Sequence, residues 1–266
     1  MAGTTMGAVL RSTQAYGLQL SKAESLDWGV AYTSPRFARL SEANQFCEFI
    51  VSQESDVPVA YEAVQAYFAA RKLTCYGWTP AADQPFEAMG QFLWEKGYRR
   101  RDLWACALVK WPEVEFQDEV RVLPARPMRQ LYRQTFLDPQ GPYPADYREL
   151  EADAGLERLD GASYEAQVAL VGNRPVGRCT LFPVGDIGRV IDLYVLSEYR
   201  RRGVATAIVA HVLGIAKRFM ARTVCLEVEA DNEAALRCVE RMGFVRDGRL
   251  VKFHHADVLL PRYGEV

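Results

Sequence analysis

The stretch YRRRGVATAIVAHVL, from Tyr199 to Leu213, decides how this sequence is interpreted. It follows the strand-like segment RVIDLYVL (189–196) and runs into apolar residues at helical spacing on one face, namely Val204, Ile208, Val212, Ile215 and Phe219. Because Gly203 and Ala205 have little or no side chain, the amides of the turn and of the first helical residues stay accessible. The helix dipole and the neighbouring arginines favour an anion there, and a pyrophosphate would fit. The alternative interpretation is a tight turn with solvated arginines.

The same tetrapeptide, YRRR, also occurs at Tyr98 to Arg101, in GYRRRDLWACAL. There it follows Gly97, which ends a predicted helix, and it leads directly into an apolar strand pattern. No helix begins at this point, so no set of N-terminal amides is available to an anion. Context therefore predicts an anion site at the second copy and none at the first.

Composition restricts the class of protein. The chain has 266 residues, of which 49% are hydrophobic and 25% charged, and its formal net charge is −2. No run approaches the roughly 20 apolar residues of a membrane span, and the first residues do not resemble a secretory signal. The balanced charge argues against nucleic acid as a partner. Six scattered cysteines without CxxC spacing argue against disulfides and a metal site. We expect a cytoplasmic protein with neither membrane nor nucleic acid as a partner.

The two halves of the chain repeat one order of elements. Each has a helix, a strand, a second helix that ends in glycine and an aromatic residue, and a further strand. In the first half we expect these at 57–72, 73–78, 86–98 and 99–111. The second half begins with a strand at 120–124, two helices and a hairpin around Asn173, and continues with strands at 189–196 and 223–230 and a helix at 231–244. The segment 111–119 is a plausible linker, so we predict domains 1–115 and 116–266.

Two motifs at this spacing resemble those of the GCN5-related N-acetyltransferase (GNAT) superfamily. RRRGVA (200–205) matches the family's loop pattern Q/R-x-x-G-x-G/A, in which x is any residue. LEVEADNEAALRCVERMGF (226–244) resembles the family's next strand and helix. The resemblance covers roughly 120–260. The first half resembles only the later part of the family's domain and lacks the phosphate loop. In this respect the chain is similar to family members built of two such domains in tandem, with a degenerate N-terminal copy.

The resemblance implies a mixed α/β fold in which two neighbouring strands splay apart and acetyl-CoA lies between them. Backbone groups of Leu193 and Val195 would pair with the pantetheine arm, and Asn232 would hold it from the far side. The pyrophosphate would rest on the phosphate turn, whose residues are Arg200, Arg201, Arg202, Gly203, Val204, Ala205 and Thr206.

Acyl transfer needs an unprotonated amine, and a lysine-type amine with a pKa of about 10.4 loses about 4.6 kcal/mol to deprotonation at pH 7. A general base is therefore useful. Glu227 should point away from Leu226 and Val228 on its strand, and it matches the position proposed for the base in family members that acetylate protein N-termini. Asp192 and Glu229 are the alternatives, either as the base or as a partner for the charged amine. A solvent-facing carboxylate is the competing interpretation of Glu227.

The general acid is not assigned. The family often has a tyrosine seven residues after the asparagine, and here Val239 stands at that position. Cys238 lies about 100° away around the helix, so it is a poor substitute, and Tyr194 is another candidate. A thiol with a pKa of about 8.5 leaves as thiolate at a cost of roughly 2 kcal/mol at pH 7, so the missing tyrosine would slow turnover without abolishing it.

We therefore predict an N-acetyltransferase that transfers an acetyl group from acetyl-CoA to the primary amine of a small molecule or a peptide. The alternative is a non-catalytic acyl-CoA-binding or regulatory protein, which the missing tyrosine motivates. The acceptor amine is the expected partner, and a homodimer is left open.

Overall fold

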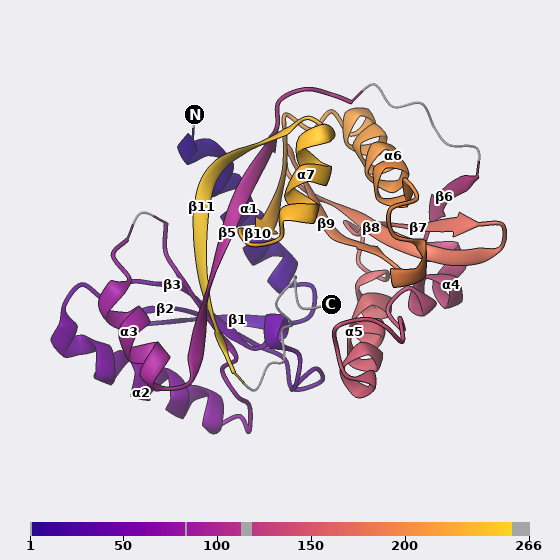
Figure 1. The fold of residues 1–266 in the computed structure, drawn as a ribbon. Helices are drawn as coiled ribbons and strands as arrows, with labels where there is room; N and C mark the ends of the chain where they lie inside the picture. The colour runs from indigo at the N-terminus through magenta and orange to yellow at the C-terminus, as the bar shows by residue number, and fades with distance from the viewer. Residues whose placement is uncertain (1, 83, 113–118, 257–266) are drawn as a thin grey trace. The chain divides into compact units, whose positions relative to one another are not determined.

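A computed structural model describes residues 2–82, 84–112 and 119–256. Contacts divide the chain into two compact units (Figure 1). Of the described residues, unit 1 comprises 2–13, 104–112 and 119–248, and unit 2 comprises 14–82, 84–103 and 249–256. Within the described ranges, no helix is both long enough and apolar enough to span a bilayer.

Unit 1 is built on a mixed sheet with the strand order β11-β5-β10-β9-β8-β7-β6. Strands β6, β7, β8 and β9 pair antiparallel in that order, whereas β9 and β10 pair parallel. The bounds are β5 Tyr98–Leu108, β6 Val120–Pro124, β7 Glu165–Val171, β8 Arg174–Val184, β9 Ile187–Val195, β10 Thr223–Glu229 and β11 Phe244–His255. The predicted mixed α/β fold is confirmed for this unit. The two-residue turn between β7 and β8 consists of Gly172, which has a φ of 59°, and Asn173, which the sequence predicted to be in the turn.

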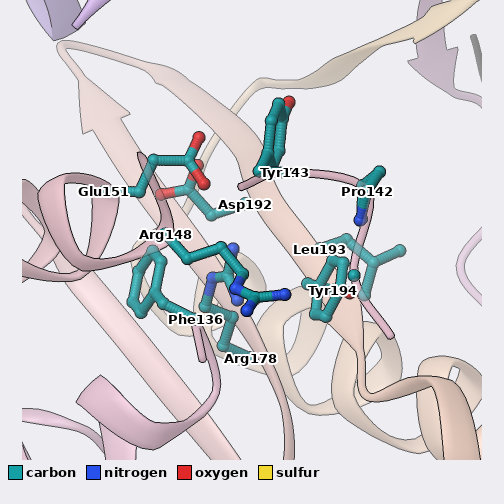
Figure 2. Close-up of a pocket in the computed structure, with 10 residues that line it drawn as sticks. Phe136, Pro142, Tyr143, Arg148, Glu151, Arg178, Asp192, Leu193 and Tyr194 are labelled. Atoms are coloured by element: carbon teal, nitrogen blue, oxygen red, sulfur yellow. The ribbon is translucent and has the colours of Figure 1, made fainter. Parts of the chain in front are cut away.

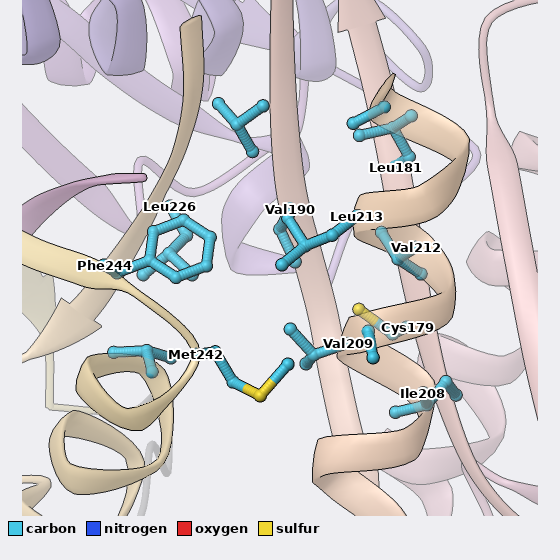
Figure 3. Close-up of a cluster of buried hydrophobic side chains, with 14 of the residues drawn as sticks. Cys179, Leu181, Val190, Ile208, Val209, Val212, Leu213, Leu226, Met242 and Phe244 are labelled. Carbon is cyan, nitrogen blue, oxygen red and sulfur yellow. The ribbon is translucent and has the colours of Figure 1, made fainter. Parts of the chain in front are cut away.

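The helices of unit 1 are the first part of α1 (Ala2–Gly17), α4 (Arg129–Gln134), α5 (Ala145–Arg158), α6 (Val204–Arg218) and α7 (Glu233–Arg241), with 3₁₀ turns η3 (Arg126–Met128) and η4 (Ser197–Tyr199). The predicted helix α6 is confirmed. Its apolar face, which includes Ile208, Val209 and Val212, packs against β8 and β9 (Figure 3). Phe219 does not join this face and is 53% exposed, because α6 ends at Arg218.

Unit 2 has the strand order β1-β2-β3-β4-β11-β5 and a hydrophobic core of its own. Trp78 is fully buried at the centre, with the rings of Phe46 and Phe49 edge-on to it at 4.9 Å and 5.9 Å. The elements are β1 Lys22–Leu26, β2 Gly29–Thr33, β3 Gln45–Phe49, β4 Gly77–Pro80, α2 Val57–Ala69 and α3 Glu87–Glu95, with 3₁₀ turns η1 (Ser41–Ala43) and η2 (Glu54–Asp56). The core of this half includes the buried aromatic residues Phe46, Phe49, Phe68, Trp78 and Tyr98, whereas Trp94 is 59% exposed.

The division into units differs from the boundary predicted after residue 115. The reason is that β5 and β11 each have residues in both units, and that the first residues of α1 belong to unit 1. In unit 1 the amide of Val109 donates to the carbonyl of Gly243 at 3.0 Å. In unit 2 the end of β11 pairs with β4, with Phe253 opposite Trp78. Of the predicted linker, residues 113–118 lie outside the described part of the chain.

Candidate active site

The turn between β9 and α6 has the backbone geometry that an anion site requires. After η4 the chain adopts positive φ at Arg201 (63°) and again at Gly203 (77°), which is the N-cap of α6 and makes no side-chain cap. The amide of Ala207 donates to the carbonyl of Gly203 at 3.0 Å. The amides of Val204, Ala205 and Thr206 therefore precede the helical ladder at the positive end of the helix dipole.

The three arginines of this turn are not equivalent. Arg200 folds back onto β9, where its Nε donates to the carbonyl of Val195 at 3.1 Å and its guanidinium to the hydroxyl of Tyr194 at 3.3 Å. Arg201 and Arg202 are exposed, and the guanidinium of Arg202 lies 5.5 Å from the ring centre of Tyr199. Arg200, which was predicted to bind the pyrophosphate, thus uses part of its guanidinium in hydrogen bonds within the protein. The carbonyl of Val195, one of the backbone groups expected to pair with pantetheine, already accepts one of these bonds.

The first YRRR copy lies where a helix ends and a strand begins, as predicted. Gly97 has a φ of 91°, and Tyr98 begins β5 with a buried hydroxyl that donates to the carbonyl of Cys75 at 2.6 Å. Arg99 lies over the ring of Trp94, and Arg100 forms an ion pair with Asp102 at 2.7 Å. The identical tetrapeptides differ in structure because their neighbours differ.

The parallel ladder between β9 and β10 is short. It joins Thr223 to Ile187, Val224 to Gly188 and Cys225 to Arg189, and in the described residues it continues no further. The second half of β9, which carries Leu193, therefore has pairing to β8 but not to β10. Backbone groups on that edge are positioned to bind an extended ligand.

A β-bulge interrupts β9 at Asp192. This residue has a φ of 55°, and the register with β8 shifts so that Asp192 and Leu193 together face Cys179. The hydroxyl of the buried Tyr164 donates to the carboxylate of Asp192, and the hydroxyl of Tyr132 lies 3.2 Å from that of Tyr164. The bulge thus places a carboxylate with fixed orientation beside the open edge of β9.

Asp192 lines a cavity of about 170 Å³ in unit 1 (Figure 2). Figure 2 shows Asp192 and Glu151 next to each other, and Arg148 beside Arg178. The lining residues are Phe136, Gly141, Pro142, Tyr143, Arg148, Glu151, Arg178, Asp192, Leu193 and Tyr194. Of the predicted site residues, the structure brings Asp192, Leu193 and Tyr194 together around this cavity.

Glu227 has a different environment. Its neighbours Leu226 and Val228 are buried in the core of unit 1, so the predicted direction of its side chain on β10 is confirmed. Its carboxylate forms an ion pair with Arg189, and the hydroxyl of Thr13 in α1 lies 3.4 Å from it. The two charged side chains are only 9% and 6% exposed. Glu227 is therefore a buried, ion-paired carboxylate, and it does not line the cavity.

The hydroxyl of Tyr194 is bound to a carboxylate that the sequence analysis missed. It donates to Asp138 at 2.8 Å, and Asp138 also accepts from the amide and the hydroxyl of Ser197 at 2.9 Å and 2.8 Å and from the amide of Gln140 at 3.0 Å. Burial opposes ionisation of Asp138, but these hydrogen bonds outweigh it and lower its pKa. Burial and then the bond to Asp138 raise the pKa of Tyr194 to about 12. Tyr194 is therefore a poor proton donor.

After the end of β10, Asn232 caps α7, because its side-chain oxygen accepts from the amide of Ala235 at 3.0 Å. Val239, at the position of the expected tyrosine, is only 2% exposed. Burial also raises the pKa of the Cys238 thiol. Neither Val239 nor Cys238 of α7 is therefore suited to act as the general acid.

Two residues near the cavity that were not predicted from the sequence, Asp138 and Arg178, have recognisable sequence neighbours. Asp138 opens the segment DPQG, whose aspartate, proline and glycine are typical of a turn with a side-chain-to-backbone bond. Arg178 is a lone charge within the apolar strand VGRCTLF, where a buried arginine needs a specific partner. Tyr164, by contrast, has no distinguishing neighbours in the sequence.

A mixed α/β domain with a short parallel ladder, a bulged strand and an amide-rich turn is an acyl-CoA N-acyltransferase type of fold. Residues 125–244 match the model of the Acetyltransferase (GNAT) family.

Relatives with curated names match a smaller part. The N-alpha-acetyltransferase 30 of Schizosaccharomyces pombe (strain 972) is 39% identical over 67 residues, which are 25% of this chain and 45% of that protein. The Homo sapiens protein of the same name is 37% identical over 67 residues, 25% of this chain and 18% of its own length. The chain thus covers less than half the length of these relatives.

Solved structures resemble the chain over more of its length. A GCN5-related N-acetyltransferase from Kribbella flavida has a TM-score of 0.64 at 17% identity, covering 94% of this chain and 95% of that one. A functionally unknown conserved protein from Staphylococcus epidermidis has a TM-score of 0.69 at 15% identity, covering 88% and 93%. At such identities the likeness shows the fold alone.

Proposed function

We propose that this protein is an N-acetyltransferase that transfers the acetyl group of acetyl-CoA to a primary amine. One observation carries the proposal: the open edge of β9 leads from the cavity beside Asp192 to the amides at the start of α6. An anion-binding turn at one end and a cavity with a carboxylate at the other are the two subsites that such a reaction needs.

Coenzyme A fits the residues of this edge. Arg201 and Gly203 are left-handed, and left-handed residues in a turn are typical of backbone nests in which successive amides bind an anion. We assign the pyrophosphate to the backbone from Arg201 to Thr206, with Arg201 and Arg202 as side-chain donors. Leu193 would pair with the pantetheine arm. Asn232 would contribute its amide NH₂, since its oxygen caps α7.

When bound, acetyl-CoA supplies a thioester whose carbonyl carbon the amine attacks as the bond to sulfur breaks. Of the three predicted bases, Glu227, Asp192 and Glu229, Asp192 is the best placed, because it lines the cavity and the other two do not. Its carboxylate would hold the ammonium and accept its proton. Glu227 would have to break its pair with Arg189 to accept a proton, so we assign it a structural role. Because the departing thiolate is stable enough near neutral pH, no dedicated acid is needed.

We also propose that unit 2 derives from the same fold. In each unit two parallel strands, β3 with β4 and β9 with β10, flank a helix in sequence. The first strand of each pair has a register shift at an acidic residue with positive φ, Glu48 (56°) and Asp192 (55°). The next helix in each unit is followed by a left-handed glycine, Gly97 (91°) and Gly243 (90°). This correspondence supports a duplication.

The copy in unit 2 would be degenerate. Pro58 stands in the first turn of α2 and has no amide hydrogen to offer an anion. Glu54 and Asp56 precede it where the other unit has arginines. Both features would repel or fail to bind a phosphate, so acetyl-CoA is assigned to unit 1 alone.

The proposal is tested with the full chain, coenzyme A titrations by calorimetry and a panel of amines assayed for thiol release with mass detection of the product. We expect micromolar binding and acetylation of at least one amine. Binding without any acetylation would favour the non-catalytic acyl-CoA-binding alternative. Absence of binding would refute both.

A further inference from the structure

Arg178 is a buried cation in the wall of the cavity beside Asp192. It lies in β8 and is 9% exposed, with its guanidinium between the rings of Phe136 at 3.6 Å and Tyr194 at 4.8 Å. Its NH1 donates to the carbonyl of Thr135 at 2.6 Å. Among the described residues it has no ion-pair partner. Because a buried charge is costly unless it is paired, this position is suited to an anion from outside the chain.

A second arginine stands beside it in the same cavity. Arg148 of α5 donates to the carbonyl of Asp138, and no described carboxylate pairs with it either. Two arginines that offer their remaining donors to one cavity are well suited to a carboxylate, which an arginine can bind with two parallel hydrogen bonds. Figure 2 shows the two guanidinium groups close together.

The opposite charge lines another part of the same cavity. Asp192 and Glu151 lie next to each other in Figure 2, and the carboxylate of Asp192 is oriented by the hydroxyl of Tyr164. The cavity is therefore bipolar, with two carboxylates in one part and two arginines in the other. A volume of about 170 Å³ is below the range of about 300 to 1,000 Å³ for drug-sized ligands, so the ligand is small.

We propose that the acceptor carries a carboxylate close to its amine, as a small amino acid does. Arg178 and Arg148 hold the carboxylate, and Asp192 and Glu151 hold the ammonium before its proton is removed. This inference rests on the proposed acetyl transfer and names the class of its acceptor. A monoamine without a carboxylate would leave the buried charge of Arg178 unbalanced.

The test compares matched acceptors with the full chain. Glycine, glycinamide and methylamine form one series, and alanine, alaninamide and ethylamine form another. For each compound, kcat/KM is measured with acetyl-CoA, and binding is measured by calorimetry with and without coenzyme A. We expect the amino acid to exceed its amide by about 10- to 100-fold in kcat/KM or in affinity, the range for a charged hydrogen bond. Calorimetry reports on the cavity even where no acetylation occurs.

Variants identify the cause of the preference. Arg148→Gln should lower the ratio of the amino acid to its amide, in kcat/KM or in affinity, by at least tenfold, while coenzyme A affinity stays within about twofold. Arg178→Lys keeps the charge and should retain part of the preference. Arg129→Gln, at an exposed pair with Asp160 outside the cavity, is the matched control and should change nothing.

Equal rates or affinities for acid and amide would overturn the inference, as would a preference that Arg148→Gln leaves intact. Acetylation of amines that lack a carboxylate, at rates above those of the amino acids, would overturn it while supporting the proposed function. Failure of coenzyme A to bind would refute the proposed function, and the calorimetric comparison of acid and amide would still decide the nature of the cavity.

Discussion

Arg189 of β9 and Glu227 of β10 form an ion pair in which neither side chain is more than 9% exposed. The NH1 of Arg189 also donates to the hydroxyl of Thr13 in α1 at 2.6 Å. Arg189 is opposite Cys225, in the last of the three pairs of the ladder between the two strands. The ion pair therefore ties α1 to the two strands at the point where they part.

Glu227→Gln should act on stability more than on chemistry. Removing one partner of a buried ion pair leaves the other charge uncompensated, so we expect the free energy of unfolding to fall by about 3 kcal/mol. Denaturant unfolding measures this. A double variant, Arg189→Met with Glu227→Leu, should lose less than the single variant. A single variant of normal stability whose kcat/KM falls by 10² or more would instead identify Glu227 as the general base.

Gly203→Glu should weaken coenzyme A binding at least tenfold. A side chain at this left-handed position is strained, and a carboxylate there would repel the pyrophosphate at the start of α6. Arg100→Ala, in the first YRRR copy, is the matched control and should leave the affinity within about twofold. Calorimetry gives both values, and a comparable loss in the control would mean that the phosphate site has been assigned to the wrong unit.

Asp192→Asn should lower kcat/KM by about 10² to 10⁴ while acetyl-CoA affinity stays within a few-fold, the pattern of a lost general base. The deficit should shrink as the pH rises toward the pKa of the acceptor amine, since a free amine needs no base. Rates measured from pH 6 to 10 test this. A deficit that is equal at every pH would assign Asp192 to binding the ammonium.

The sequence was sufficient where the pattern is local. The strand, turn and helix around Gly203 follow from small residues, arginines and apolar spacing within about 30 residues, and the contrast between the two YRRR copies follows from their immediate neighbours. Strands β1 to β3 were not predicted. In β1, KAESL, every residue but the last is exposed, so the strand has no apolar alternation to detect.

What the sequence could not reveal depends on contacts between distant segments. Glu227 has the alternation of an outward-facing carboxylate, but its partner Arg189 is 38 residues away and becomes visible only through the register of the parallel strands. The division of β5 and β11 between the two units likewise depends on pairing of residues far apart. The bulge at Asp192 is an extra residue of β9 relative to β8, so it becomes visible only when the two strands are paired.

Asp138→Asn should destabilise the protein at neutral pH and not at low pH. Hydrogen bonds from Ser197, Tyr194 and Gln140 hold the pKa of Asp138 below its usual 3.8, so its ionised form stabilises the fold above about pH 4. That stabilisation, about 1 to 3 kcal/mol, should disappear as the pH falls through the lowered pKa. Asp160→Asn, at an exposed pair with Arg129, is the control and should have little effect at any pH, because solvent screens that pair. Thermal unfolding of the two variants and the parent from pH 2.5 to 7 checks this, and a difference for Asp138→Asn that persists unchanged at pH 2.5 would contradict it.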